Sequence, residues 1–134
     1  MTETVQSGMN LAAKTSLRFL LAALVFLGLL AVAGCHSYHV DTTVENRTGK
    51  PVNLLEVDYP SASFGTGKLD SGAVYSYRMQ FRNSGPLKVI YTAEDGHQIT
   101  VDGPEVAAKQ EGRLQIVLLP GGKAEFHPEL TPAP

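Results

Sequence analysis

The sequence of 134 residues contains no tryptophan and only one cysteine. A single cysteine excludes a disulfide bond within the chain, so packing and hydrogen bonds must stabilise the fold. In an exported protein, a cysteine without a partner requires an explanation as a free thiol, a bridge to another chain or a modified residue. The position of Cys35 in the chain is therefore informative.

The chain also has little excess of charge of either sign. The formal net charge is −2, and the residues after Gly34 carry nine basic and twelve acidic side chains. Because no basic stripe is present, the sequence has no electrostatic footprint for nucleic acid, and we expect no nucleic-acid partner. A weakly acidic, mixed surface of this kind is typical of a soluble domain.

Catalytic and metal-binding motifs are missing as well. No serine lies in a Gly-x-Ser-x-Gly elbow, and no glycine-rich phosphate loop follows a strand and opens a helix. Glu94, Asp95 and Asp102 flank one hairpin, where turn chemistry explains them better than a calcium loop does. The histidines lack the spacing of a zinc helix motif, and we interpret them as surface residues: His36, His39, His97 and His127. We therefore predict no catalytic residue, no cofactor and no metal site.

What the sequence does contain is a long apolar run near its start. Lys14 and Arg18 precede an uninterrupted apolar segment from Phe19 to Ala33. A basic region followed by such a segment is the pattern of an export signal. The segment has about 15 residues, fewer than the roughly 20 that a helix needs to span a bilayer core. Met9 is an alternative start that would leave a more typical basic region.

The end of this run is more specific. Val32-Ala33-Gly34-Cys35 resembles the lipobox of bacterial lipoproteins, which has an apolar residue, two small residues and then the cysteine at the cleavage site. Val32 stands where leucine is more common. The resemblance implies cleavage between Gly34 and Cys35, a diacylglyceryl group on the Cys35 thiol and a further acyl chain on its amine. The alternatives are an uncleaved transmembrane anchor and an ordinary secretory signal.

Lipid on Cys35 would make the membrane the first partner of the mature protein. One acyl chain binds a bilayer reversibly, whereas two or more hold a protein there durably. His36, rather than aspartate, follows the cysteine. In lipoproteins of two-membrane bacteria, aspartate at that position commonly retains the protein in the inner membrane. We therefore expect the periplasmic face of the outer membrane in preference to the inner membrane.

The rest of the chain has the pattern of short strands. Apolar residues recur with a period near two, and turns follow at short intervals, as at Asp95-Gly96 and Pro120-Gly-Gly122. The doublet Leu54-Leu55 breaks the alternation and indicates a bulge. Gly65 and Gly67 indicate that the short strand containing them lies at an edge or a bend. The strands that we expect cover residues 40–45, 52–59, 64–69, 73–81, 87–92, 98–101, 113–119 and 124–127.

Seven or eight such strands predict an all-β fold, an antiparallel immunoglobulin-like β-sandwich that follows an N-terminal helical signal segment. The immunoglobulin Cys…Trp…Cys core is absent, so the likeness is one of architecture. The succession of the motifs Asn46-x-Thr-Gly49 and Leu-x-x-Gly resembles that in uncharacterised small lipoprotein domains. This resemblance does not imply any particular activity. We predict a signal peptide at 1–34, a lipidated tether at 35–39, the sandwich at 40–127 and a proline-rich disordered tail at 128–134, with 103–112 a connecting segment.

Two surface features are candidates for contacts. Tyr75, Tyr77 and Phe81 share one strand face, which we interpret as the buried face of a central strand rather than an exposed platform. Arg78, Arg82 and Lys88 form a candidate contact patch on the opposite side. The sequence favours a non-enzymatic envelope lipoprotein whose sandwich binds another envelope protein or a surface ligand. The alternatives are a small envelope enzyme and a lipoprotein with a ligand cavity between its sheets.

Overall fold

The computed structural model describes residues 2–31 and 37–134. It divides into two compact units, Met1–Ser37 and Tyr38–Pro134. The first holds helix α1 (Thr2–Ala31), which fits the helical leader expected from the sequence. Within the described part of the chain, no helix combines the length and the apolar character needed to cross a membrane. The predicted cleavage site at Gly34 and Cys35 lies outside the described residues.

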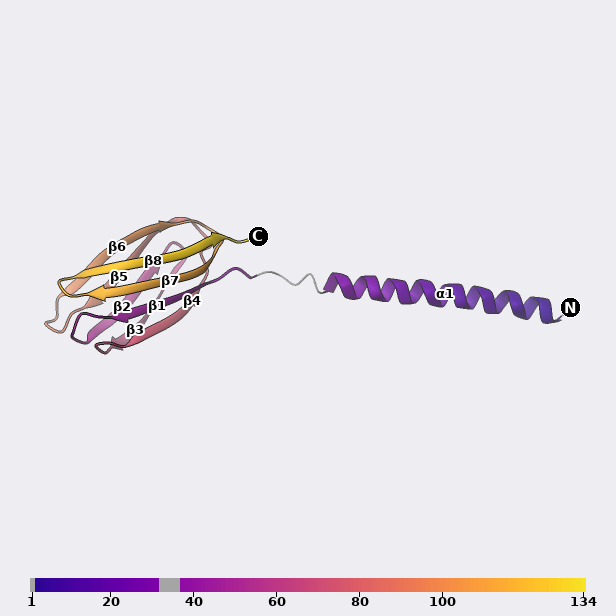
Figure 1. Ribbon diagram of the computed structural model, residues 1–134, viewed down its shortest axis with the longest axis horizontal. Helices are drawn as coiled ribbons and strands as arrows, with labels where there is room; N and C mark the ends of the chain where they lie inside the picture. Colours follow the sequence, from indigo (N-terminus) through magenta and orange to yellow (C-terminus); the bar gives the residue numbers. More distant parts are fainter. Residues whose placement is uncertain (1, 32–36) are drawn as a thin grey trace. The chain divides into compact units, whose positions relative to one another are not determined.

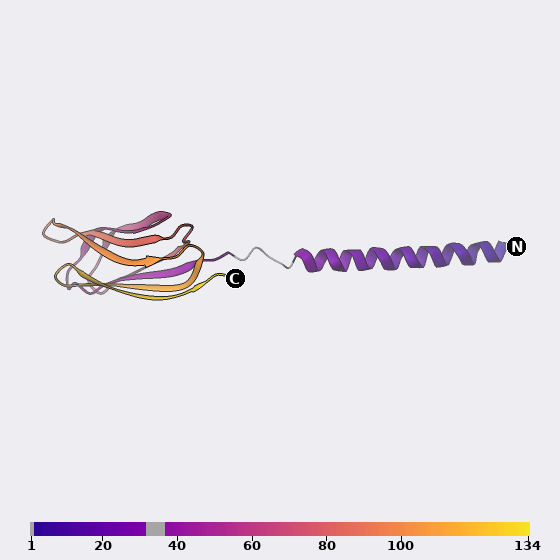
Figure 2. The same cartoon turned by 90° about the horizontal axis from the view of Figure 1, so that it is seen from above.

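The second unit is a β-sandwich of two four-stranded sheets, which confirms the predicted fold class (Figures 1 and 2). One sheet has the strand order β4-β1-β7-β8 and the other β3-β2-β5-β6. Among the described strands, β1 and β7 pair in parallel, which departs from the expected antiparallel arrangement, and the other pairs are antiparallel. The strands are β1 (Val40–Asn46), β2 (Val52–Tyr59), β3 (Ala62–Leu69), β4 (Val74–Met79), β5 (Gly85–Thr92), β6 (Gln98–Val106), β7 (Gln110–Leu119) and β8 (Lys123–Pro132).

The core lies between the two sheets, where alternate residues of each strand point inward. Burial of apolar side chains is the main favourable term in folding, at about 25 cal/mol per Å² removed from water. Five of the eight strands contribute apolar residues that are less than 3% exposed. These residues are Val40, Val44, Val52, Leu55, Val57, Met79, Leu87, Val89, Tyr91, Leu114, Ile116 and Leu118.

The predicted bulge is present at the leucine doublet in β2. The pairing of β2 with β5 shifts register between Asn53 and Glu56, and Leu54 adopts a φ of 48°. The extra residue places Leu54 in solvent, 69% exposed, while Leu55 stays in the core. The predicted edge position of the glycine-containing strand is also confirmed, because β3 lies at the edge of its sheet.

The prediction that residues 103–112 form a connecting segment was wrong. Strand β6 continues to Val106 and β7 begins at Gln110. Pro104 is tolerated because β6 is an edge strand, where a missing N–H need not break a ladder. Gly103 is needed for packing rather than for a turn, since a Cβ there would lie 2.8 Å from the ring of Phe126.

The prediction of a disordered tail at 128–134 was also wrong. Strand β8 continues to Pro132 and pairs with β7 throughout, with Leu114 opposite Pro128 and Gln110 opposite Pro132. Along a strand, successive N–H groups point to alternate sides, so prolines four residues apart remove donors from the same side. That side faces away from β7, because β8 is an edge strand. The prolines therefore leave the ladder intact.

The aromatic stripe lies on an edge strand, not on a central one. Phe81 is buried as expected, the neighbouring Met79 is buried as well, and Tyr75 is half-buried. Tyr77 is 40% exposed, because β4 borders the side of the sandwich where β3 and β4 meet. There its ring stacks on Phe64, with 4.4 Å between the centroids. The stripe thus seals the side of the core.

One buried polar group has no partner among the described residues. The Oγ1 atom of Thr42 lies in the core and makes no hydrogen bond. We predict that Thr42→Val, which keeps the shape and removes the hydroxyl, raises the free energy of unfolding by about 1 kcal/mol. Urea unfolding followed by circular dichroism measures this, with Thr43→Val on the outer face as the matched control. A less stable Thr42→Val variant would contradict the prediction.

Candidate functional site

Four loops gather at the end of the sandwich opposite Tyr38, and we call this end the tip. They are the β1–β2 loop at 47–51, the β3–β4 turn at 70–73, the β5–β6 hairpin at 93–97 and the β7–β8 hairpin at 120–122. The strand order requires this, because β1, β3, β5 and β7 all run toward the tip and their successors return from it. Loops on a rigid scaffold are the usual place for binding residues.

Asn46 fixes two of these loops. Its side chain is fully buried, and its Nδ2 donates to the carbonyl oxygens of Lys50 (2.7 Å) and Leu69 (3.0 Å). Its Oδ1 accepts a hydrogen bond from the backbone N–H of Thr48 (3.0 Å). Its own backbone N–H donates to the carbonyl of Ala73 (3.0 Å). The Asn-x-Thr-Gly sequence is therefore a structural device that holds the β1–β2 loop against the β3–β4 turn.

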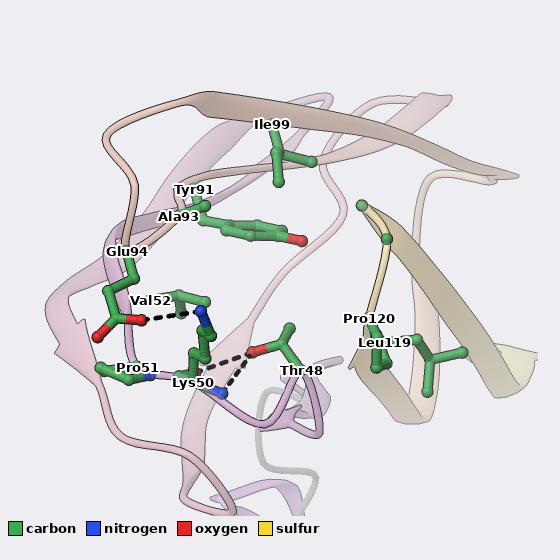
Figure 3. A pocket seen from close by; sticks show the side chains of 12 residues that line it. Thr48, Lys50, Pro51, Val52, Tyr91, Ala93, Glu94, Ile99, Leu119 and Pro120 are labelled. Atoms are coloured by element: carbon green, nitrogen blue, oxygen red, sulfur yellow. Dashed lines mark hydrogen bonds and ion pairs between the residues drawn. The ribbon is translucent and has the colours of Figure 1, made fainter.

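A cavity of about 170 Å³ opens at the tip, and we call it the tip cavity (Figure 3). Three of the four loop regions contribute to it, together with the ends of β2, β5, β6 and β7. Its walls are mainly apolar and include Val52, Ile99, Leu119 and Pro120. A mainly apolar lining with few polar groups is the usual composition of a ligand pocket.

Tyr91 is the most deeply buried polar side chain of the tip cavity, which Thr48, Lys50 and Glu94 also line. The residue is 2% exposed, and its ring and hydroxyl point into the cavity beside Ile99, its cross-strand partner (Figure 3). Burial raises the pKa of the Tyr91 phenol, so the neutral hydroxyl is the form present near pH 7. Tyr91 therefore presents a neutral hydroxyl to the cavity, whereas the Thr48 hydroxyl is already bonded to Asn46 Oδ1 and to the Lys50 carbonyl.

An ion pair borders the mouth of the tip cavity. Lys50 Nζ lies 3.4 Å from Glu94 Oε2, and both side chains are well exposed. An exposed pair of this kind adds little to stability, because water and salt screen it. It does connect the β1–β2 loop to the β5–β6 hairpin and leaves the mouth without net charge.

The structure does not gather the predicted contact patch of Arg78, Arg82 and Lys88. Arg78 lies on the outer face of β4, where its Nε donates to Asp41 Oδ1 at 2.8 Å and holds the pKa of that carboxyl below its usual value. Lys88 lies in the other sheet, opposite Asp58 and between β2 and β6. Arg78 and Lys88 therefore point away from opposite sides of the sandwich.

Arg82 lies at the end of the domain opposite the tip. It follows β4, and its backbone N–H donates to Ser61 Oγ at 2.8 Å. Close to Lys88, burial and the neighbouring Glu56 raise the pKa of Asp58, an effect that Lys88 partly offsets. Each of the three basic residues thus has its own local surroundings.

Of the histidines that the structure describes, His97 and His127 are exposed and His39 is partly buried. His97 Nδ1 is 2.9 Å from Asp95 Oδ2, and His127 Nε2 is 3.1 Å from Glu125 Oε2. Hydrogen bonds from the backbone and ring of His97 hold the pKa of Asp95 below its usual value. Over residues 2–31 and 37–134, no group of three histidine, cysteine, aspartate or glutamate side chains has the arrangement of a metal site. His36 lies outside the described residues.

Sequence reasoning missed the tip cavity. One sequence feature could have indicated it: Tyr91 continues the inward-facing series of Leu87 and Val89 near the end of a strand. A buried tyrosine hydroxyl usually has a hydrogen-bond partner, and no neighbouring sequence feature supplies one here.

Comparisons with known proteins place the domain by its architecture alone. No family model matches the chain. No curated protein matches it. Among solved structures, it is similar to the NMR structure of a protein from Eubacterium rectale, with 14% sequence identity and a TM-score of 0.51. The match covers 72% of this chain and 95% of that one. At this identity the likeness shows a shared fold and says nothing about activity.

We predict that Asn46→Ala lowers the free energy of unfolding by about 2–4 kcal/mol, because it leaves the carbonyls of Lys50 and Leu69 without their donor. Chemical denaturation measures the change. Asn83→Ala, the same substitution at an exposed position, should change stability by less than about 0.5 kcal/mol. Equal effects of the two substitutions would show that Asn46 does not hold the tip together.

Proposed function

We propose that this protein is a lipid-anchored lipoprotein of the bacterial cell envelope whose β-sandwich binds a partner and catalyses no reaction. The observation that carries the proposal is the single cysteine, Cys35, which directly follows two small residues at the end of the apolar run. The compact unit that follows begins at Tyr38, three residues after Cys35. Cleavage before Cys35 would remove the leader and leave the sandwich whole.

The short link between Cys35 and β1 would keep the domain close to the bilayer. A fully extended chain spans at most about 3.6 Å per residue, so Val40 would lie within roughly 18 Å of the Cys35 backbone. The end of the sandwich that carries Tyr38 would face the membrane, and the tip would point away from it. Its loops would be the part most accessible to a partner.

Strand edges on one side of the sandwich offer a second contact surface. The edge strands β3 and β4 contain no proline and keep their outward N–H donors. On the other side, β6 and β8 carry Pro104, Pro128 and Pro132, which protect an edge against strand addition. We therefore place strand pairing with a partner at β3 and β4, next to the exposed side chains of Tyr77 and Val74.

Lipidation is tested by replacing its acceptor. We predict that the wild-type chain incorporates labelled fatty acid and enters the detergent phase, whereas Cys35→Ala takes up no label and keeps its leader. The reason is that the Cys35 thiol is the acceptor for the diacylglyceryl group in the lipoproteins that the sequence resembles. Ser37→Ala, the same size of change two residues away, should behave as wild type. Labelled Cys35→Ala would refute the lipoprotein assignment.

Binding at the strand edge is tested by site-specific photo-crosslinking in cells. A crosslinking amino acid in place of Val74, on β4, should give a discrete adduct with an envelope component. The same amino acid in place of Asp102, on the outer face of β6, should give none. Adducts of equal yield from both positions, or from neither, would contradict a binding edge at β3 and β4.

A further inference from the structure

The tip cavity contains a tyrosine hydroxyl that is open to the cavity. Tyr91 is 2% exposed, and Thr42 Oγ1, not the Tyr91 hydroxyl, is the described side-chain polar atom that is enclosed without a hydrogen-bond partner. The Tyr91 hydroxyl is therefore available to a hydrogen-bonding group that enters the cavity. Figure 3 shows the hydroxyl pointing into the open space between Ile99 and the β7–β8 hairpin.

We propose that the tip cavity binds one uncharged six-membered ring that carries a single hydrogen-bonding oxygen. This inference rests on the proposed binding function of the domain and names the chemistry that its tip would recognise. The oxygen would pair with the Tyr91 hydroxyl, and the ring would lie against the apolar walls formed by Val52, Ile99 and Leu119.

The size of the cavity fits a ring of this kind. An engineered apolar cavity of about 150 Å³ in another protein holds benzene. The tip cavity, at about 170 Å³, has room for such a ring and one substituent atom. A fused or longer ligand would have to extend past the mouth, where Lys50 and Glu94 meet.

The lining also selects against a charged ligand. Transfer of an ion into an apolar space is costly unless an opposite charge lies beside it. The charged groups at the cavity, Lys50 and Glu94, lie at the mouth, neutralise one another and are exposed. The interior offers the Tyr91 hydroxyl, which can donate a hydrogen bond to a neutral oxygen or accept one from a hydroxyl group.

The test compares two rings that differ by one oxygen. Phenol and toluene are titrated into the full-length chain in detergent micelles, and NMR shifts of the amides of Ala93, Gly121 and Gly122 are followed. Tyr91→Phe removes only the hydroxyl and should weaken phenol binding about 3- to 10-fold relative to its effect on toluene. Each probe partly dissolves in the micelles, but to the same extent for the wild type and the variant. The comparison of the two affinity changes, one for phenol and one for toluene, is therefore unaffected by this loss of free probe.

Two further variants locate the site. Ile99→Phe places a larger side chain in the cavity and should abolish the shifts. Ile90→Phe, the same substitution on the outer face of β5, should leave them unchanged. If phenol causes no shift at these amides, or if Tyr91→Phe affects phenol and toluene alike, the proposal is overturned and the cavity holds only water.

A blocked tyrosine, N-acetyl-tyrosine methylamide, distinguishes two sources of the same chemistry. If it competes with phenol, the ring belongs to a tyrosine side chain of a partner protein. If phenol binds and the blocked tyrosine does not, the ligand is a free small molecule. Both results depend on Tyr91 and are independent of lipid on Cys35 and of crosslinking at Val74, so a failure here leaves the proposed function standing.

Discussion

Each sheet of the sandwich must bury one apolar face against the other, and the remaining features follow from that requirement. Side chains alternate along every strand, so the inward positions of eight strands supply a continuous core without help from a disulfide bond. At the sides, Phe64 and Tyr77 stack where β3 meets β4. At the tip the sheets cannot seal one another, and loops must cover the end of the core.

Covering the tip explains why the most informative polar residues are found there. Backbone groups in the loops need partners once they are buried, and Asn46 provides them for the β1–β2 loop and the β3–β4 turn. Between the loops the packing is incomplete, and the tip cavity with Tyr91 remains. Strand β7 has 10 residues, so the tip lies about 30 Å from the other end of the domain. A lipid-anchored protein of this design would present its cavity well above the bilayer surface.

The sequence predicted the features that depend on alternation. The apolar alternation with a period of two predicted the sandwich, and the Leu54-Leu55 doublet predicted the bulge. The glycines of β3 predicted its edge position. The errors concern residues 103–112 and 128–134, whose glycines and prolines were interpreted as signs of a connecting segment and of a disordered tail. Gly103 instead makes room for Phe126, and Pro128 and Pro132 point their missing donors away from β7. Such positions depend on which strand is an edge, and that is a property of the tertiary arrangement.

The candidate site was less accessible to sequence reasoning. Arg78, Arg82 and Lys88 are close in sequence but belong to different faces and loops, because the chain passes from one sheet to the other between β4 and β5. The tip cavity, in contrast, joins residues from Thr48 to Gly122 that only the fold brings together. Local spacing identifies motifs confined to one segment, such as the lipobox-like sequence before Cys35, and it fails for sites assembled from several loops.

We propose that the finished protein begins at a lipid-modified Cys35. The most direct measurement is the intact mass of the native protein isolated from membranes, with sequencing of its N-terminal peptide by mass spectrometry. We expect a chain that starts at Cys35, with a mass increased by a diacylglyceryl group and one further acyl chain. A chain that starts at Met1 or Met9, or a Cys35 that carries a free thiol, would contradict the account.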